Sequence, residues 1–129
     1  MKILFVDDIR DTREFFRFAF QLDQVDVELA ANGQEAVRMA TKEQFDAIVM
    51  DVEMPKMNGW EAVRAIRALP DSGKARRVPI LMYTAAIDNG IRARAQEVGA
   101  DVVLFKPLLP REILARIEKL LENNPVTER

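Results

Sequence analysis

Five short apolar segments recur along the chain, and they restrict its fold more than any other feature of the sequence. They cover residues 3–6, 25–30, 47–50, 78–83 and 102–105. Four of them are continuous rather than alternating, which is typical of strands buried on both faces of a parallel sheet. Residues 25–29 alternate apolar and polar side chains instead, and this segment therefore predicts a strand at the edge of the sheet.

Segments with helical spacing lie between and after these strands. The last is the clearest, because its apolar residues fall at i, i+4, i+7 and i+8 with a proline near the first turn. These residues are Pro110, Ile113, Ile117, Leu120 and Leu121. Strand and helix alternate five times, which predicts a doubly wound α/β sandwich.

Composition limits both the size and the chemistry of the protein. The 129 residues, 49% of them hydrophobic, suit one domain with a full core, which we place at residues 1–122 before a C-terminal tail at 123–129. The absence of Cys and His excludes triads, zinc sites and redox chemistry built on those residues. A net charge of −2 gives little attraction to nucleic acid or anionic membranes. No segment approaches the roughly 18 apolar residues of a membrane span, so we expect neither partner.

Polar side chains follow four of the five predicted strands. The first strand is followed by Asp7 and Asp8, the third by Asp51, the fourth by Thr84 and the fifth by Lys106. In a sheet of order 2-1-3-4-5 these strands are neighbours, and their carboxyl ends form one crevice. One such residue is common at a strand end, but four strands together indicate a site. Three mutually repelling carboxylates predict Mg²⁺, beside which a carboxylate can attack a phosphoryl group.

In this order and spacing, the same residues resemble the receiver domain of bacterial response regulators, in particular a stand-alone receiver similar to the chemotaxis regulators. The motifs are Val6-Asp7-Asp8, Met50-Asp51-Val52-Glu53-Met54-Pro55, Thr84-Ala85, Gly99-Ala100-Asp101 and Phe105-Lys106-Pro107. The resemblance covers residues 2 to about 121. It implies a flavodoxin-like fold: a five-stranded parallel sheet of order 2-1-3-4-5 with five helices on its two faces. It also implies a cytoplasmic protein that accepts a phosphoryl group from a histidine kinase or a phosphotransfer protein.

The resemblance implies a role for each acidic position. Asp51 matches the phosphoacceptor, and Asp7 and Asp8 match the acidic pair, with Asp8 and Asp51 as direct Mg²⁺ ligands. Glu53 matches the position whose backbone carbonyl completes the metal shell. The chain is therefore expected to bind Mg²⁺ and to catalyse only its own phosphorylation and dephosphorylation.

Thr84 matches the switch hydroxyl and Lys106 the phosphate-pairing lysine, whose bond to Pro107 is usually cis in the family. The chain departs from the family at Val103, where receivers commonly carry Tyr or Phe. Phe105 lies next to Lys106, and we expect its side chain on the face of the strand opposite Val103. The departure affects the aromatic side chain that is usually coupled to the switch hydroxyl in the family, and it leaves the phosphorylation residues intact.

The first predicted helix is rich in phenylalanine. Phe15, Phe18 and Leu22 share a stripe that we expect to face the core. Phe16 and Phe20 lie on a neighbouring stripe, which either widens the core face or is partly exposed as a docking surface for the phosphodonor.

The partners and the alternative function follow from the resemblance. We expect a receiver without an output domain, whose signal passes to an unidentified downstream protein, and homodimerisation through its last two helices stays open. The alternative is a receiver-fold interaction module that works without phosphorylation. The intact set of site residues favours the phosphorylated receiver, because receivers that have lost this activity usually lack one or more of them.

Overall fold

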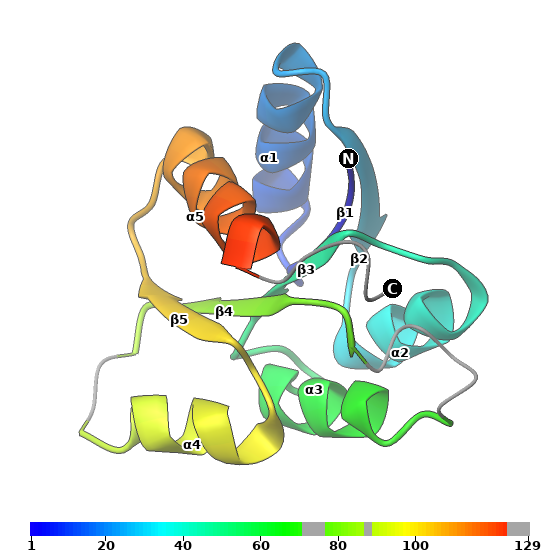
Figure 1. Cartoon of the computed structure of the whole chain (residues 1–129), viewed down its shortest axis with the longest axis vertical. Helices are drawn as coiled ribbons and strands as arrows, with labels where there is room; N and C mark the ends of the chain where they lie inside the picture. Colours follow the sequence, from blue (N-terminus) through cyan, green and yellow to red (C-terminus); the bar gives the residue numbers. More distant parts are fainter. Residues whose placement is uncertain (71–76, 87–88, 124–129) are drawn as a thin grey trace.

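A five-stranded parallel sheet forms the centre of the computed structural model, which describes residues 1–70, 77–86 and 89–123 (Figure 1). The strand order is β2-β1-β3-β4-β5, as predicted. The strands are β1 (Lys2–Val6), β2 (Asp26–Ala30), β3 (Ala47–Asp51), β4 (Ile80–Thr84) and β5 (Val102–Phe105). The alternating segment is thus an edge strand, while β3 and β4 are buried at every residue.

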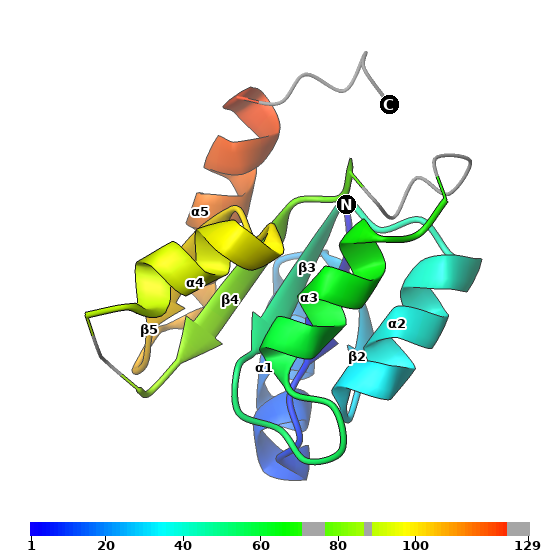
Figure 2. The same ribbon diagram turned by 90° about the horizontal axis from the view of Figure 1, so that it is seen from below.

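Helices cover both faces of the sheet (Figures 1 and 2). On one face lie α1 (Arg10–Leu22) and α5 (Pro110–Asn123), and on the other lie α2 (Gly33–Lys42), α3 (Gly59–Arg67) and α4 (Ile91–Val98). Alternate residues of each central strand enter two separate cores: Leu4 and Val6 pack with α2 to α4, whereas Ile3 and Phe5 pack with α1 and α5. Burial on both faces explains why these strands are continuously apolar in the sequence.

Two helices on the same face begin with the same capping chemistry. The Asn32 side chain accepts a hydrogen bond from the backbone N–H of Glu35, and Asn58 does the same for Glu61. Glu61 also accepts the backbone N–H of Asn58, which completes a capping box at the start of α3. This cap sets the start of the helix that follows the loop after Asp51.

On α1, the prediction that Phe15, Phe18 and Leu22 face the core was wrong, whereas the alternative that Phe16 and Phe20 belong to the core face is confirmed. Phe16 and Phe20 are buried, whereas Phe15, Phe18 and Leu22 are 57%, 64% and 68% exposed. Both stripes are apolar, so periodicity alone does not decide which one faces the sheet. Aromatic packing on β1 determines which stripe is buried, because the ring of Phe16 stacks on the ring of Phe5 with their centroids 4.6 Å apart.

The structure describes the predicted domain at residues 1–122 except for residues 71–76 and 87–88, and only the first residue of the predicted tail. Helix α5 continues to Asn123, and the rest of the tail expected at 123–129 lies outside the described residues. Within residues 1–70, 77–86 and 89–123, no helix combines the length and apolar character needed to span a membrane.

Candidate functional site

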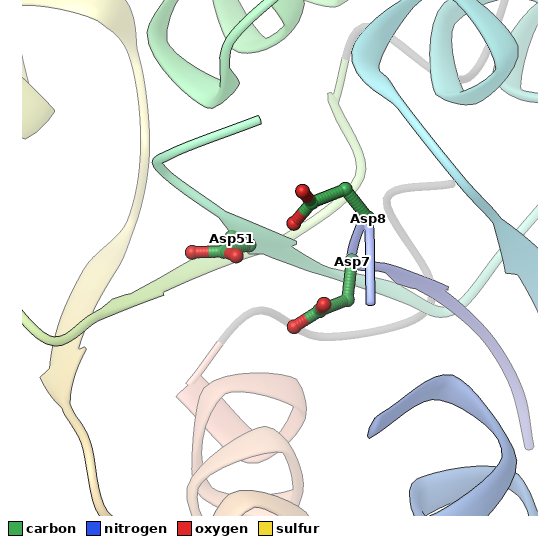
Figure 3. A group of neighbouring side chains, drawn as sticks. All are labelled: Asp7, Asp8 and Asp51. Carbon is green, nitrogen blue, oxygen red and sulfur yellow. The ribbon is translucent and has the colours of Figure 1, made fainter. Parts of the chain in front are cut away.

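Three carboxylates meet at the carboxyl ends of β1 and β3 (Figure 3). Asp51 is the last residue of β3, and Asp7 and Asp8 directly follow β1. One carboxylate oxygen from each residue lies within 4.8 Å of the others, and two of the three side chains, Asp7 and Asp51, are buried. Oxygen ligands with one open side suit a hard divalent cation such as Mg²⁺, so the donor set fits the predicted metal.

The loop after Asp51 is held against the start of α3 by a glycine. The backbone N–H of Gly59 donates to the carbonyl of Val52 over 2.8 Å. A Cβ at this position would lie 2.3 Å from the carbonyl oxygen of Asp51, so only glycine permits the approach. The backbone N–H of Glu53 reaches Oδ1 of Asp51 at 3.4 Å, which is a weak contact that keeps Glu53 beside the acidic cluster.

Lys106, which directly follows β5, carries the positive charge of the site. Its Nζ lies 3.5 Å from Oδ2 of Asp51 and 3.9 Å from Oδ2 of Asp7. The bond from Lys106 to Pro107 is cis, as expected. The backbone N–H of Lys106 donates to the carbonyl of Thr84 over 2.8 Å, which joins the ends of β4 and β5.

The surroundings of Asp51 disfavour its charge in the absence of a cation. Burial raises the pKa of the Asp51 carboxyl from 3.8 to about 6. Lys106 opposes this rise and lowers the pKa, whereas the nearby Asp7 adds to it. The single lysine therefore does not compensate for burial and like-charge repulsion together.

Thr84 ends β4 and is fully buried. Its Oγ1 accepts the backbone N–H of Ala86 over 3.0 Å. In this arrangement the hydroxyl shapes the turn after β4, while the three carboxylates and Lys106 form the charged centre beside it.

The expected placement of Phe105 opposite Val103 was wrong. Both side chains pack on the same core, the one beneath α2 to α4, because residues two apart on a strand share a face. Val103 is 7% exposed, and the Arg92 guanidinium lies 5.0 Å from the centroid of the Phe105 ring. Phe105 is also the register partner of Thr84. The aromatic ring on this face is therefore at position 105, two residues closer to Lys106 than position 103, where receivers commonly carry Tyr or Phe.

Sequence reasoning missed Tyr83, which contacts two residues of the charged centre. Its hydroxyl donates to Oδ2 of Asp7, and Nζ of Lys106 lies 4.4 Å from the centroid of its ring. Burial raises the pKa of the Tyr83 hydroxyl, and its bond to Asp7 raises it further, so the proton stays on the donor. The available signal was a tyrosine in an otherwise apolar buried strand, since a buried hydroxyl needs a partner.

A cleft of about 510 Å³ opens beside the exposed member of the acidic pair. Asp8 and Glu53 line one part of it, and Trp60 and Arg94 line another. The Arg94 guanidinium lies 5.1 Å from the centroid of the Trp60 ring. The cleft leaves the acidic cluster open to a ligand from the α3 and α4 side.

Two curated proteins that are similar to this chain are regulators of about twice its length. The family model of the response regulator receiver domain matches residues 3–118. The response regulator MprA of Mycobacterium leprae is 40% identical over 121 residues, which are 94% of this chain and 51% of that protein. A transcriptional regulatory protein CpxR homolog from Haemophilus influenzae is 37% identical over 123 residues, which are 95% and 51% of the two chains. The chain thus spans about half the length of these curated relatives.

Two solved structures align with nearly the whole chain. The chemotaxis protein CheY4 of Vibrio cholerae is 36% identical with a TM-score of 0.83, over 93% of this chain and 98% of that one. The receiver domain of the sensor histidine kinase PA1611 from Pseudomonas aeruginosa is 32% identical with a TM-score of 0.81, over 92% and 94%. That structure has a magnesium ion coordinated in its active-site cleft.

Proposed function

The chain belongs to the response regulator receiver family of two-component signalling, and from this premise we propose that Asp51 accepts a phosphoryl group in a Mg²⁺-dependent reaction. The donor is a histidine kinase or a phosphotransfer protein. The observation that carries the proposal is the Asp51 carboxylate itself, which is buried at the end of β3, 3.5 Å from the Lys106 ammonium and beside two further carboxylates.

The residues divide the chemistry between them. Asp7, Asp8 and Asp51, with the backbone carbonyl of Glu53, would hold Mg²⁺, which when bound supplies positive charge to the carboxylates and to the phosphoryl oxygens. One Oδ of Asp51 attacks phosphorus in line, and the donor nitrogen leaves as the acyl phosphate forms. The Lys106 ammonium pairs with a phosphoryl oxygen as negative charge gathers there. The protein performs no reaction other than its own phosphorylation and dephosphorylation.

The phosphorylated state differs from the free state at the ends of β4 and β5. The Thr84 hydroxyl donates to a phosphoryl oxygen, and its movement biases a pre-existing two-state equilibrium. Lys106 is tied to Thr84 through the backbone, and Phe105 stands opposite Thr84 in register, so the change reaches the face between α4 and α5. A downstream protein, or a second copy of the chain, binds that face in the cytoplasm.

The donor docks on the exposed apolar stripe of α1. Phe15, Phe18 and Leu22 form this stripe, and α1 starts three residues after Asp7. Buried Phe16 and Phe20 fix the helix from below, so the docking role moves from those two residues to the exposed ones.

Intact-mass spectrometry after incubation with acetyl phosphate tests the proposal. The wild type should gain one phosphoryl group with Mg²⁺ and none with EDTA, and Asp51→Asn should gain none under either condition. Asp26→Asn, which changes an exposed aspartate on the edge strand β2, is the matched control and should behave as the wild type. Phosphorylation of Asp51→Asn at the wild-type rate would refute the assignment. Mg²⁺ binding without phosphorylation by acetyl phosphate or a cognate donor would favour the phosphorylation-independent module.

A further inference from the structure

Tyr83 connects the charged centre to the aromatic core beneath α1. It is only 2% exposed, and its ring lies 5.6 Å from that of Phe5 and 6.2 Å from that of Phe16, centroid to centroid. From this packed position its hydroxyl reaches Oδ2 of Asp7 and its ring face reaches the Lys106 ammonium. One side chain thus contacts both a carboxylate and the cation of the site.

The hydroxyl completes the hydrogen bonding of a buried carboxylate. Asp7 is fully buried, and its Oδ1 already accepts the backbone N–H of Ile9 over 2.8 Å. Tyr83 supplies the donor on Oδ2, so each oxygen has one directional partner and the plane of the carboxylate is determined. Lys106 approaches Oδ2 only to 3.9 Å, which is too long to replace that bond.

The ring acts on Lys106 in a complementary way. A cation over an aromatic face is attracted by the ring quadrupole, and this attraction is stronger where the group is partly removed from water. The Lys106 side chain is 28% exposed. Its ammonium therefore contacts both the ring of Tyr83 and Oδ2 of Asp51, which lies 3.5 Å away.

We propose that Tyr83 is a positioning residue for the metal site: its hydroxyl orients Asp7 toward a divalent cation, and its ring keeps Lys106 over the acceptor side of the cluster. The proposal rests on the proposed function, because it requires that the cluster binds Mg²⁺. Partners that orient a metal-ligating side chain commonly contribute about ten- to a hundredfold to metal affinity.

Tyr83→Phe tests the hydroxyl alone, since it keeps the ring, its packing and its contact with Lys106. We expect the affinity for Mg²⁺ to fall about tenfold. Titration with Mg²⁺, followed by the fluorescence of Trp60 in the cleft beside Asp8, measures this affinity. Titration with Mn²⁺, with the free ion counted by electron paramagnetic resonance, measures it without relying on the tryptophan.

Phe16→Leu is the matched control, because it alters packing on the same ring and leaves the hydroxyl in place. Its Mg²⁺ affinity should equal that of the wild type, while a merely structural role of Tyr83 predicts equal affinities for all three proteins. Equal affinities for wild type and Tyr83→Phe would refute the positioning role alone. Failure of the wild type to bind either ion would refute the proposed function as well.

A second measurement needs no substitution. Tyr83 is the only tyrosine of the chain, so labelling with 3-fluorotyrosine gives a single ¹⁹F resonance from the hydroxyl-bearing ring. This resonance should shift as Mg²⁺ is added, with the same midpoint as the Trp60 signal. A resonance that stays in place while the ion saturates the site would contradict the proposal whether or not the Tyr83→Phe protein folds.

Discussion

Removing the charge of Asp51 should stabilise the metal-free protein, although Asp51 is the proposed phosphoacceptor. Its pKa is raised from 3.8 in the unfolded chain to about 6 in the fold, because the charged carboxylate is buried beside another carboxylate. A shift of about two pH units corresponds to about 3 kcal/mol of destabilisation at neutral pH. This net shift already includes the attraction of Lys106. Because the Asn amide is still a buried polar group, we expect Asp51→Asn to recover only part of the cost and to raise the free energy of unfolding by about 1–2 kcal/mol.

The pH dependence has a definite sign. A carboxyl whose pKa is higher in the folded state binds its proton more tightly there. The contribution of Asp51 to the free energy of unfolding therefore rises as the pH falls through about 6 toward 3.8. Below 3.8 the group is protonated in both states, and the difference between wild type and variant should disappear. Urea denaturation in EDTA, at neutral pH and at about pH 4, measures both effects.

Mg²⁺ should reverse the order of stability. A cation that binds the folded protein stabilises it according to its affinity, and the wild type offers one more carboxylate than Asp51→Asn. Asp26→Asn, at an exposed position, should change the free energy of unfolding by less than about 0.5 kcal/mol under all conditions. If Asp51→Asn is no more stable than the wild type in EDTA at neutral pH, the account of the buried charge is wrong.

Two further predictions concern transfer and response. Phe18→Ser should slow transfer from a cognate phosphodonor and leave the rate with acetyl phosphate unchanged, because Phe18 is exposed on α1; equal donor rates would rule out the docking stripe. Thr84→Ala should still be phosphorylated but should show smaller phosphorylation-induced NMR shifts on β4 and β5 than the wild type, whereas Thr41→Ala on α2 should respond fully.

The sheet and the acidic cluster could be predicted because both depend on simple periodic rules. Continuous apolar strands identify a parallel sheet, and the polar residues Asp7, Asp51 and Lys106 follow such strands directly. Because parallel strands end at one edge, the predicted sheet order 2-1-3-4-5 was enough to bring these side chains together. The receiver family was predicted from the same residues and is confirmed by the family model.

The errors arose where a local pattern has two solutions. On α1, both phenylalanine stripes satisfy the helical period, and only the ring of Phe5 beneath Phe16 selects one. The prediction put Phe105 on the wrong face of β5. It lies two residues from Val103, and side chains two residues apart on a strand point to the same face. Tyr83 was missed because its role depends on a hydrogen bond across β3 to Asp7, which no spacing along the chain reveals.

The stability of the sheet explains why the acidic cluster needs a ligand rather than a rearrangement to relieve its repulsion. Asp51 ends a strand in which all five residues are buried, and Asp7 follows a strand that is buried at its last four positions. Moving either carboxylate toward solvent would expose part of one of the two cores, at about 25 cal/mol for each Å² of apolar surface. The backbone therefore holds the charges together, and binding a cation becomes the less costly way to offset them.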